Sequence, residues 1–309
     1  MLKSVGRFLY IPMENFQKQY YTPSSLVQLL HQRGLIITDF SKAEDYIRHI
    51  GYYRLSAYFY PFLEQPKSEH KFKPGASFEK VMQLYRFDRK LRLLLFNEIE
   101  KIETAVRQAI VNTVCEATHD PFWITNPATF AKREKFAYML GLINKEYEKS
   151  NEDFIKHFKT KYANAYPPAW ELIEILPLGV MTRIYENLRD FKIQKKIANE
   201  FYLNMPVLQS WLTLITLTRN ACCHHSRVWN KTNAITTLSM KRMKRNWLLK
   251  QPNQQKIYYN LCLIKYFLDV INPTNNLRQK LIDLFQQYPS IDIKAMGFTD
   301  EWLLEPLWK

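Results

Sequence analysis

Glycine is scarce in this sequence, with only 7 among 309 residues. Long segments show helical apolar spacing and none shows a sustained strand-like alternation, so a β-rich fold is not favoured. The four cysteines have no Cys-x-x-Cys spacing, which does not favour a disulfide framework. Long hydrophobic runs are missing too, because LCLIKYFLDVI covers only about half of a bilayer span and contains Lys265. The sequence therefore predicts an all-α protein without a membrane span.

Positive charge, by contrast, is abundant. Lys and Arg number 44 against 29 Asp and Glu, which gives a formal net charge of +15. Such an excess favours a polyanionic partner, and nucleic acid before a membrane surface. The opening MLKSVGRFLYIPMENF lacks the apolar segment and cleavage site of a secretory signal. We therefore expect a cytoplasmic protein whose partner is nucleic acid.

Three regions are predicted along the chain. The polar, proline-containing loop EQPKSEHKFKPG separates an N-terminal helical region, 1–75, from a helical core with inserted helices, 76–288, and a C-terminal tail follows at 289–309. The core opens with its longest helical pattern, SFEKVMQLYRFDRKLRLLLFNEIEKIETAVRQAIVNTVCEATHD, which fits one helix or two joined end to end. In the first region, Ser41 and Glu44 have the spacing of a helix capping box. Tyr52, Tyr53 and Arg54 fall among aromatic residues and are expected to pack, although they could also stack on bases.

Reactive side chains are concentrated in LTRNACCHHSRVWN, residues 217–230. A zinc site within this stretch is not expected, because structural zinc ligands are separated by two or more residues whereas these cysteines and histidines are consecutive. A thiol nucleophile is no better supported, since Cys223 and His224 diverge on a helix and cysteines in a buried helix usually act as small hydrophobes. No metal and no cofactor is expected here.

A third interpretation combines arginine with histidine. On a helix continuing through 217–230, Asn220, Arg227 and His224 fall roughly 100°, 80° and 140° from Arg219, while His225 falls at about 240°. Arginine suits a phosphate because its fork donates paired hydrogen bonds, and histidine transfers protons near neutral pH. Together they are the groups needed to cleave RNA without a metal. A buried histidine–asparagine pair bracing the core, with the arginines in salt bridges, fits the spacing equally well.

The longer stretch WLTLITLTRNACCHHSRVWN closely resembles the abortive-infection (AbiD/AbiF-like) phage-defence family of bacteria. Further segments of that family's pattern occur in order, from about residue 20: LLHQRGLIITD, YIRHIGYYRLSAYFYPF, FEKVMQLYRFDRKLR, EIEKIETAVR and PPAWELIEILPLG. The resemblance implies an all-α, HEPN-type helical bundle with an N-terminal extension. It also implies a protein that acts on or binds RNA during phage infection, in some members alongside a small non-coding RNA.

By the same resemblance, Arg219 and His224 match the two defining positions of the Arg-x4-His pattern of the HEPN superfamily, and Asn220 matches the polar position between them. His225 and Arg227 match the flanking pattern as supporting residues. The chain departs from the family at Cys223, where alanine is common, and at PLGVMT, where Ser-Phe-Gly is more frequent. Neither departure removes a reactive group.

These observations predict a metal-independent endoribonuclease with Arg219, Asn220 and His224 as its catalytic residues. HEPN nucleases, by resemblance, build the site from two such helices, so a homodimer is expected. The segment KRMKR, with Lys241, Arg242, Lys244 and Arg245, could guide an RNA backbone or be a solvated loop. Two alternatives stay open: a HEPN-type RNA-binding protein that does not cut, and a protein-interaction component of a defence system.

Overall fold

The computed structural model describes residues 15, 17 and 19–309. Across these residues it contains twelve α-helices and no β-strand, and the extended backbone forms only three isolated bridges. The predicted all-α fold is confirmed. The chain divides into two compact units, Met1–Met82 and Gln83–Lys309.

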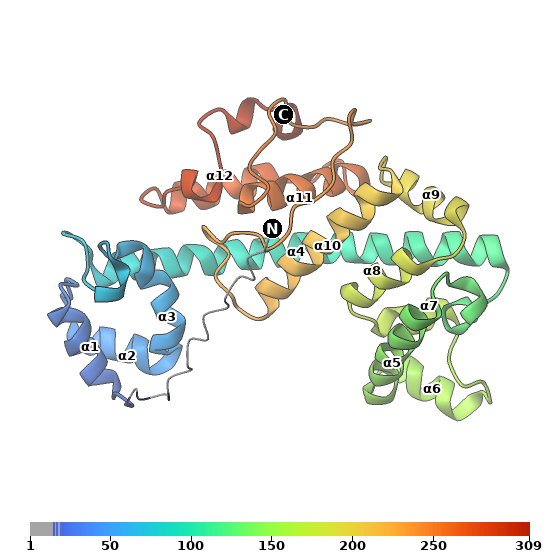
Figure 1. The fold of residues 1–309 in the computed structure, drawn as a ribbon, viewed down its shortest axis with the longest axis horizontal. Helices are drawn as coiled ribbons and strands as arrows, with labels where there is room; N and C mark the ends of the chain where they lie inside the picture. The colour runs from blue at the N-terminus through green and yellow to red at the C-terminus, as the bar shows by residue number, and fades with distance from the viewer. Residues whose placement is uncertain (1–14, 16, 18) are drawn as a thin grey trace, which may run out of the picture. The chain divides into compact units, whose positions relative to one another are not determined.

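The first unit contains three short helices, drawn in blue in Figure 1. They are α1 (Pro23–Gln32), α2 (Phe40–Ile50) and α3 (Tyr52–Phe59). The side chain of Thr22 caps α1, and Gly51 ends α2 with a φ of 92° that suits glycine. The predicted Ser41–Glu44 capping box is wrong, because α2 begins earlier and Asp39 accepts from the amide of Lys42 at 2.9 Å.

The helix α3 is only partly buried. Leu55, Tyr58 and Phe59 are in the core, but Tyr53 is 92% exposed and Arg54 is exposed as well. The expectation that Tyr53 and Arg54 pack is therefore wrong. A helix of eight residues has room for only one buried face, so an aromatic sequence cannot bury every ring.

The longest element is α4 (Phe78–Thr118), a single helix of 41 residues that begins in the first unit and continues through the second. It is the long teal helix of Figure 1. Its apolar stripe is fully buried at Leu91, Leu95, Ile99 and Ile102. The two-helix alternative is excluded.

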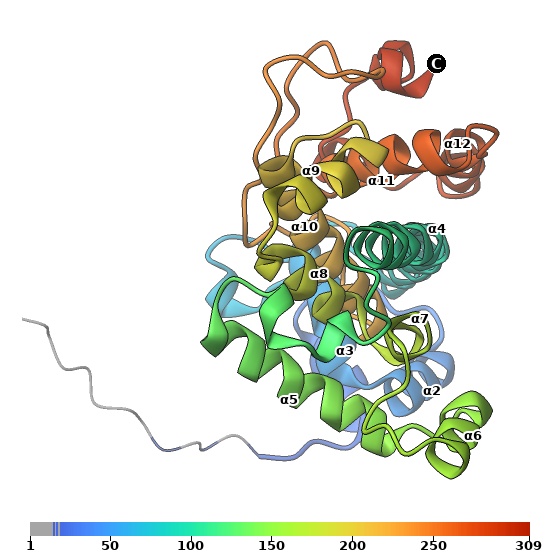
Figure 2. The ribbon, with the colours of Figure 1, turned by 90° about the vertical axis from the view of Figure 1, so that its right-hand side faces the viewer.

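The other helices of the second unit pack around α4 and α10. Their bounds are α5 (Arg133–Lys149), α6 (Asp153–Lys161), α7 (Ala169–Leu172), α8 (Leu178–Asn187), α9 (Phe191–Glu200), α10 (Met205–Cys223), α11 (Ile257–Ile271) and α12 (Leu277–Gln287). Figure 2 looks along α4, with α8 and α10 on one side of it and α11 and α12 above. The helix α10 contacts α8, α9 and α11 and is central to this unit.

The core of the second unit is strongly aromatic. The Trp211 ring on α10 stacks on Trp247 and meets Tyr266 of α11 edge to face, both with ring centres 5.2 Å apart. The C-terminal residues join this core, since Trp308 is fully buried and stacks on Tyr258 of α11. Such packing fixes α10 between α4 and α11 and so positions the residues at its C-terminal end.

None of the helices in the described part of the chain has both the length and the apolar character needed to cross a bilayer.

Candidate functional site

The helix α10 carries the first two predicted catalytic residues in its last turns. It begins where the Asn204 side chain accepts from the amide of Val207 at 3.0 Å, with Pro206 in the first turn. Trp211, Leu212 and Ile215 anchor its middle in the core, where each is at most 1% exposed. Because the middle of the helix is fixed, Arg219 and Asn220 are held at the surface as half-buried side chains.

The helix ends at Cys223, so the expectation that it continues through 230 is wrong. His224 is its C-cap, and His225 has a left-handed backbone with a φ of 55°. The amide of Ser226 donates to the carbonyl of Ala221 at 2.9 Å, and that of His225 to the carbonyl of Cys222 at 3.1 Å. These two bonds form the Schellman motif that commonly stops a helix. His224 stays close to helical register, with φ −84° and ψ 10°, whereas Arg227 lies beyond the helix.

The stop places the two adjacent histidines in different backbone conformations. His225 occupies the left-handed position of the motif, a conformation in which histidine is enriched among residues other than glycine. His224 is tied to the helix through its own amide, which donates to the carbonyl of Asn220 at 2.9 Å. Both imidazoles are exposed, and neither makes a hydrogen bond to any residue that the structure describes. The imidazole of His224 is therefore accessible to a substrate, as the side chain that follows the last turn.

Arg219 is oriented by a carboxylate on α4. Its Nε lies 3.6 Å from Oε2 of Glu103, and its side chain is 27% exposed. Glu103 also pairs with Arg107 on α4 at 3.4 Å, and Arg107 in turn pairs with Glu174 at 3.2 Å. Glu103 thus lies between two guanidinium groups and holds one side of Arg219, while part of that side chain remains open to solvent.

A buried carboxylate on α4 fixes the chain just after the helix stop. Asp88 is fully buried and accepts from the amides of Val228, at 3.1 Å, and Trp229, at 2.6 Å. Arg92, one turn along α4, is also buried and pairs with Asp88. The Trp229 ring is buried too, and its Nε1 donates to the carbonyl of Asp292 at 3.2 Å. Together these contacts anchor the turn that contains His225 and Arg227.

Asp88, Arg92 and Glu103 were missed by reasoning from the sequence. Asp88 and Arg92 are four residues apart inside an apolar stripe, and that spacing was the available signal for a buried pair. No comparable signal marked Glu103, because its partner Arg219 is 116 positions away by the numbering of the two residues.

The first cysteine of the stretch, Cys222, is a core side chain. Burial raises the pKa of the Cys222 thiol to about 12, so this side chain stays protonated near neutral pH. A thiolate is the form needed by a nucleophile or a zinc ligand. Cys222 is buried while both histidines are exposed, so the consecutive residues do not converge on one point. The arrangement favours neither a thiol nucleophile nor a zinc site within this stretch.

The four basic residues of KRMKR lie near the opposite end of α10. Lys241, Arg242, Lys244 and Arg245 are all exposed. The guanidinium of Arg245 is 5.1 Å from the centre of the Tyr202 ring and donates to the carbonyl of Asp269 at 3.2 Å. The segment around them is attached to α10 through Leu238, whose carbonyl accepts from Trp211 at 2.9 Å. Trp211 and His224 are separated by about 20 Å along the helix axis. The structure therefore does not bring these cations beside His224.

A small cavity adjoins the last turns of α10. It has a volume of about 150 Å³, and its lining includes Leu217, Thr218, Lys231 and Asn260 but no carboxylate. Asn260 donates to the Thr218 hydroxyl at 2.7 Å, which holds both polar groups at the wall. A lining of one cation and several neutral polar groups is compatible with part of an anionic ligand.

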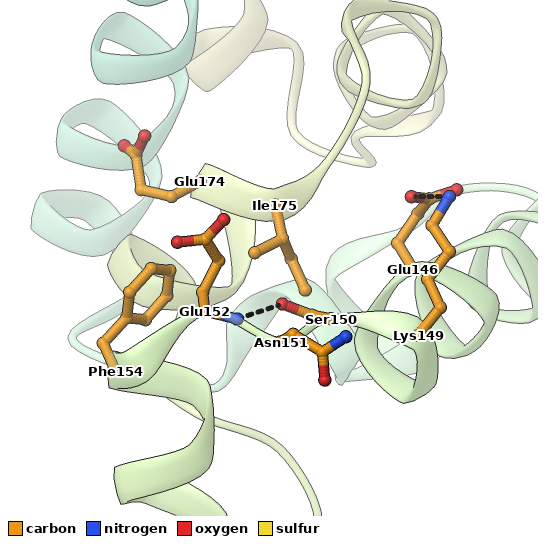
Figure 3. Close-up of a pocket in the computed structure, with 8 residues that line it drawn as sticks. All are labelled: Glu146, Lys149, Ser150, Asn151, Glu152, Phe154, Glu174 and Ile175. Carbon is orange, nitrogen blue, oxygen red and sulfur yellow. Dashed lines mark hydrogen bonds and ion pairs between the residues drawn. The ribbon is translucent and has the colours of Figure 1, made fainter.

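A second cavity of the same unit has the opposite character. Figure 3 shows this pocket of about 690 Å³ between α5, α6 and the short helix after α7, with Glu146, Glu152 and Glu174 in its wall. Lys149 is the one cation that lines it, and it is paired with Glu146 at 2.6 Å. Such a lining repels phosphate. Glu174 in the pocket wall instead accepts a hydrogen bond from Arg107, the residue of α4 that also pairs with Glu103.

These features define an all-α protein with an arginine and an exposed histidine at the end of one buried helix. The family model described as Abi-like protein matches residues 45–230, which is more than half of the chain. The chain belongs to the family of Abi-like proteins, and the predicted abortive-infection family is confirmed. The match ends at Asn230, directly after the turn that Asp88 anchors. Neither the curated proteins nor the solved structures include a match to the chain.

Proposed function

We propose that this Abi-like protein acts in phage defence as a HEPN-type endoribonuclease, with Arg219, Asn220 and His224 as its catalytic residues. The observation that carries the proposal is the exposed imidazole of His224 at the C-cap of α10, directly after the turns that hold Arg219 and Asn220. RNA cleavage by its own 2′-hydroxyl requires proton transfer and phosphate binding, which an imidazole and an arginine can supply. The last turns of α10 and its C-cap carry one of each.

In the proposed reaction the ribose 2′-oxygen attacks the adjacent phosphorus and the bond to the 5′-oxygen breaks. His224 takes the proton from the 2′-hydroxyl or gives one to the leaving 5′-oxygen. Arg219 stabilises the charge that develops on the phosphoryl oxygens. The products are a 2′,3′-cyclic phosphate and a 5′-hydroxyl end, and the reaction proceeds without a metal ion.

The contacts of Arg219 support this role. Glu103 faces its Nε, so the guanidinium is oriented before a substrate arrives. The 27% exposure of the side chain leaves a path by which a phosphate can reach it. Glu103 and Asp88 act as positioning residues in this proposal, one for Arg219 and the other for the turn after His224.

A homodimer follows from the chemistry. In-line cleavage benefits from both a base and an acid, whereas one copy of the Arg219–His224 pair supplies one imidazole in helical register. Two copies of α10 brought together would supply both. Light scattering of the active protein should therefore give the mass of two chains, and a monomer with full activity would overturn this part of the proposal.

The four cations of KRMKR are proposed to contact RNA at a distance from the cleaved bond. They are exposed near the N-terminal half of α10. Replacing Lys241, Arg242, Lys244 and Arg245 with alanine should flatten the log–log dependence of binding on salt by roughly 0.7 per lost contact with single-stranded RNA. An unchanged slope would identify the segment as a solvated loop.

One observation favours the alternative of RNA binding without cleavage. Arg219 is paired with Glu103, and a carboxylate at this distance offsets part of the positive charge that a transition state needs. In that case the protein would hold a small structured RNA, and its Arg–His pair would contribute to binding alone.

Incubation of the purified protein with end-labelled RNA separates the two functions. The nuclease proposal expects cleavage that persists in EDTA and leaves 2′,3′-cyclic phosphate ends. Tight binding with intact RNA would favour the alternative. Activity lost in EDTA and restored by one divalent ion would contradict the metal-independent mechanism.

A further inference from the structure

The first unit contains a groove that the site on α10 does not use. It has a volume of about 1140 Å³ and is lined by residues of α1, the C-terminal part of α2, α3 and the loops before α1 and after α3. All of its lining residues fall within Met1–Met82. Five tyrosines are among them, and we refer to the feature as the tyrosine groove: Tyr20, Tyr21, Tyr52, Tyr53 and Tyr60.

Packing does not account for three of these rings. Tyr53 is 92% exposed, Tyr20 86% and Tyr60 53%. On the same helix Tyr58 is only 1% exposed. The helix α3 therefore packs its other aromatic residues into the core and directs Tyr53 outward. Single exposed apolar residues are ordinary on a protein surface, but several aromatic rings around one groove mark a binding surface.

The charge of the groove is one-sided. Its lining includes Arg33, Arg48 and Lys67 but no aspartate or glutamate. Arg48 is paired with Glu44 and Asp45, outside the lining. Arg33 makes no side-chain hydrogen bond or ion pair with any of the described residues, so its fork is available to a ligand.

Lys67 and Tyr60 form a combined unit within the groove. The Nζ of Lys67 lies 3.7 Å from the centre of the Tyr60 ring and donates to the Tyr60 carbonyl at 3.0 Å. This contact holds an ammonium group on one face of the ring. A cation is thereby fixed beside an aromatic ring. A nucleotide can use both, because the cation can bind its phosphate and the ring can stack on its base.

We propose that the tyrosine groove binds single-stranded RNA, with bases stacked on Tyr53 and Tyr60 and phosphates at Arg33 and Lys67. Proteins that bind single strands with little sequence preference use a positively charged groove with aromatic rings on which the bases stack. A duplex keeps its bases inside, where these rings cannot reach them. An acidic peptide would satisfy the cations but would leave the flat faces of the tyrosines without a partner.

Binding of a short fluorescein-labelled oligouridine to the full chain, measured by fluorescence anisotropy, tests the proposal. All variants carry His224→Ala, so that cleavage does not remove the probe. Tyr53→Ala should weaken binding about tenfold, since stacking of one base contributes about that much. Tyr53→Phe keeps the ring and should keep the affinity. Arg54→Ala, at an exposed position on the same helix outside the lining, is the matched control and should bind like the parent.

The salt dependence provides a second measurement on the same proteins. Arg33→Ala should reduce the log–log slope by about 0.7, the value for one lost phosphate contact on a single strand. Circular dichroism should show the parent's helix content in every variant, because neither Tyr53 nor Arg54 is in the core.

Three results would overturn the proposal. The first is wild-type affinity for the oligouridine in a folded Tyr53→Ala variant. The second is competition by a blunt RNA duplex that equals competition by the single strand. The third is competition by polyglutamate with no competition by unlabelled RNA, which would assign the groove to an acidic protein. None of these readouts involves cleavage, so they are independent of the nuclease proposal.

Discussion

The buried carboxylate of Asp88 provides a demanding prediction. Asp88→Ala removes the acceptor of two backbone amides and leaves the buried guanidinium of Arg92 without this partner. Breaking one partner of a buried ion pair costs about 3–5 kcal/mol, and each amide left unsatisfied adds about 1–3 kcal/mol if the turn does not rearrange. Because the turn can open and let water accept from the two amides, we expect the cost of the broken ion pair alone, a loss of about 3–5 kcal/mol. This is a large fraction of the stability of a typical domain.

Hydrogen exchange measured by mass spectrometry locates the loss. In Asp88→Ala, peptides that cover residues 224–231 should exchange faster, while peptides from the first half of α10 should change less. Urea denaturation should show the lower midpoint. Asp153→Ala is the matched control, because its carboxylate is fully exposed and its one ion pair among the described residues is with Lys156 at 3.8 Å. It should shift the midpoint far less than Asp88→Ala does. Unchanged midpoint and unchanged exchange in Asp88→Ala would refute the idea that Asp88 anchors this turn.

Three further predictions concern stability and reactivity. Burial raises the pKa of Glu98, but hydrogen bonds from Lys101 and Lys280 more than offset this and hold it below the usual 4.5. This stabilisation is present above the unfolded pKa and is lost as the pH falls through the folded pKa. Glu98→Gln should therefore lower the unfolding free energy by about 1–3 kcal/mol at pH 7 and by little in acid. An equal loss of unfolding free energy at both pH values would contradict this role of Glu98. His225→Val should cost about 1–2 kcal/mol in thermal denaturation because of the left-handed backbone, whereas His225→Gly should not, and equal stability of the two would contradict the Schellman stop. Cys222 should resist alkylation by iodoacetamide in the native protein and react only after denaturation, because its buried thiol stays protonated; rapid native labelling of this residue would contradict its assignment as a core side chain.

Periodicity predicted most of the helical architecture, but it did not predict where α10 stops. Helical spacing located α4, because its continuous apolar stripe must be buried. The end of α10 depends on backbone bonds of Ser226 and His225 to the last turn, and the sequence lacks the glycine that usually marks such an end. Histidine occupies that position instead, so the predicted helix runs seven residues beyond the observed end at Cys223, to Asn230.

Within the candidate site, the sequence identified residues that are close along one helix and missed those that distant segments contribute. Arg219, Asn220 and His224 could be selected from the sequence because they are close along one helix and keep its register. Glu103 could not, and the spacing of Asp88 and Arg92 could indicate only a buried pair, since the contacts of Asp88 and Glu103 with the site join segments that are distant in the chain. Tyr53 shows the converse error, in which an aromatic composition predicted burial although the short helix α3 buries only one face.

The cleavage rate of the His224→Ala variant tests the central claim most directly, with His225→Ala as its adjacent control. Both imidazoles are exposed, but His224 directly follows the last turn of α10 in helical register, whereas His225 belongs to the stop that comes after it. Loss of general acid–base help should slow cleavage in His224→Ala by roughly 10²–10⁴-fold, with unchanged helix content and unchanged RNA binding. His225→Ala should retain more activity and lose chiefly stability. Full cleavage by a folded His224→Ala variant would contradict the assignment of the site and leave RNA binding without cleavage as the better account.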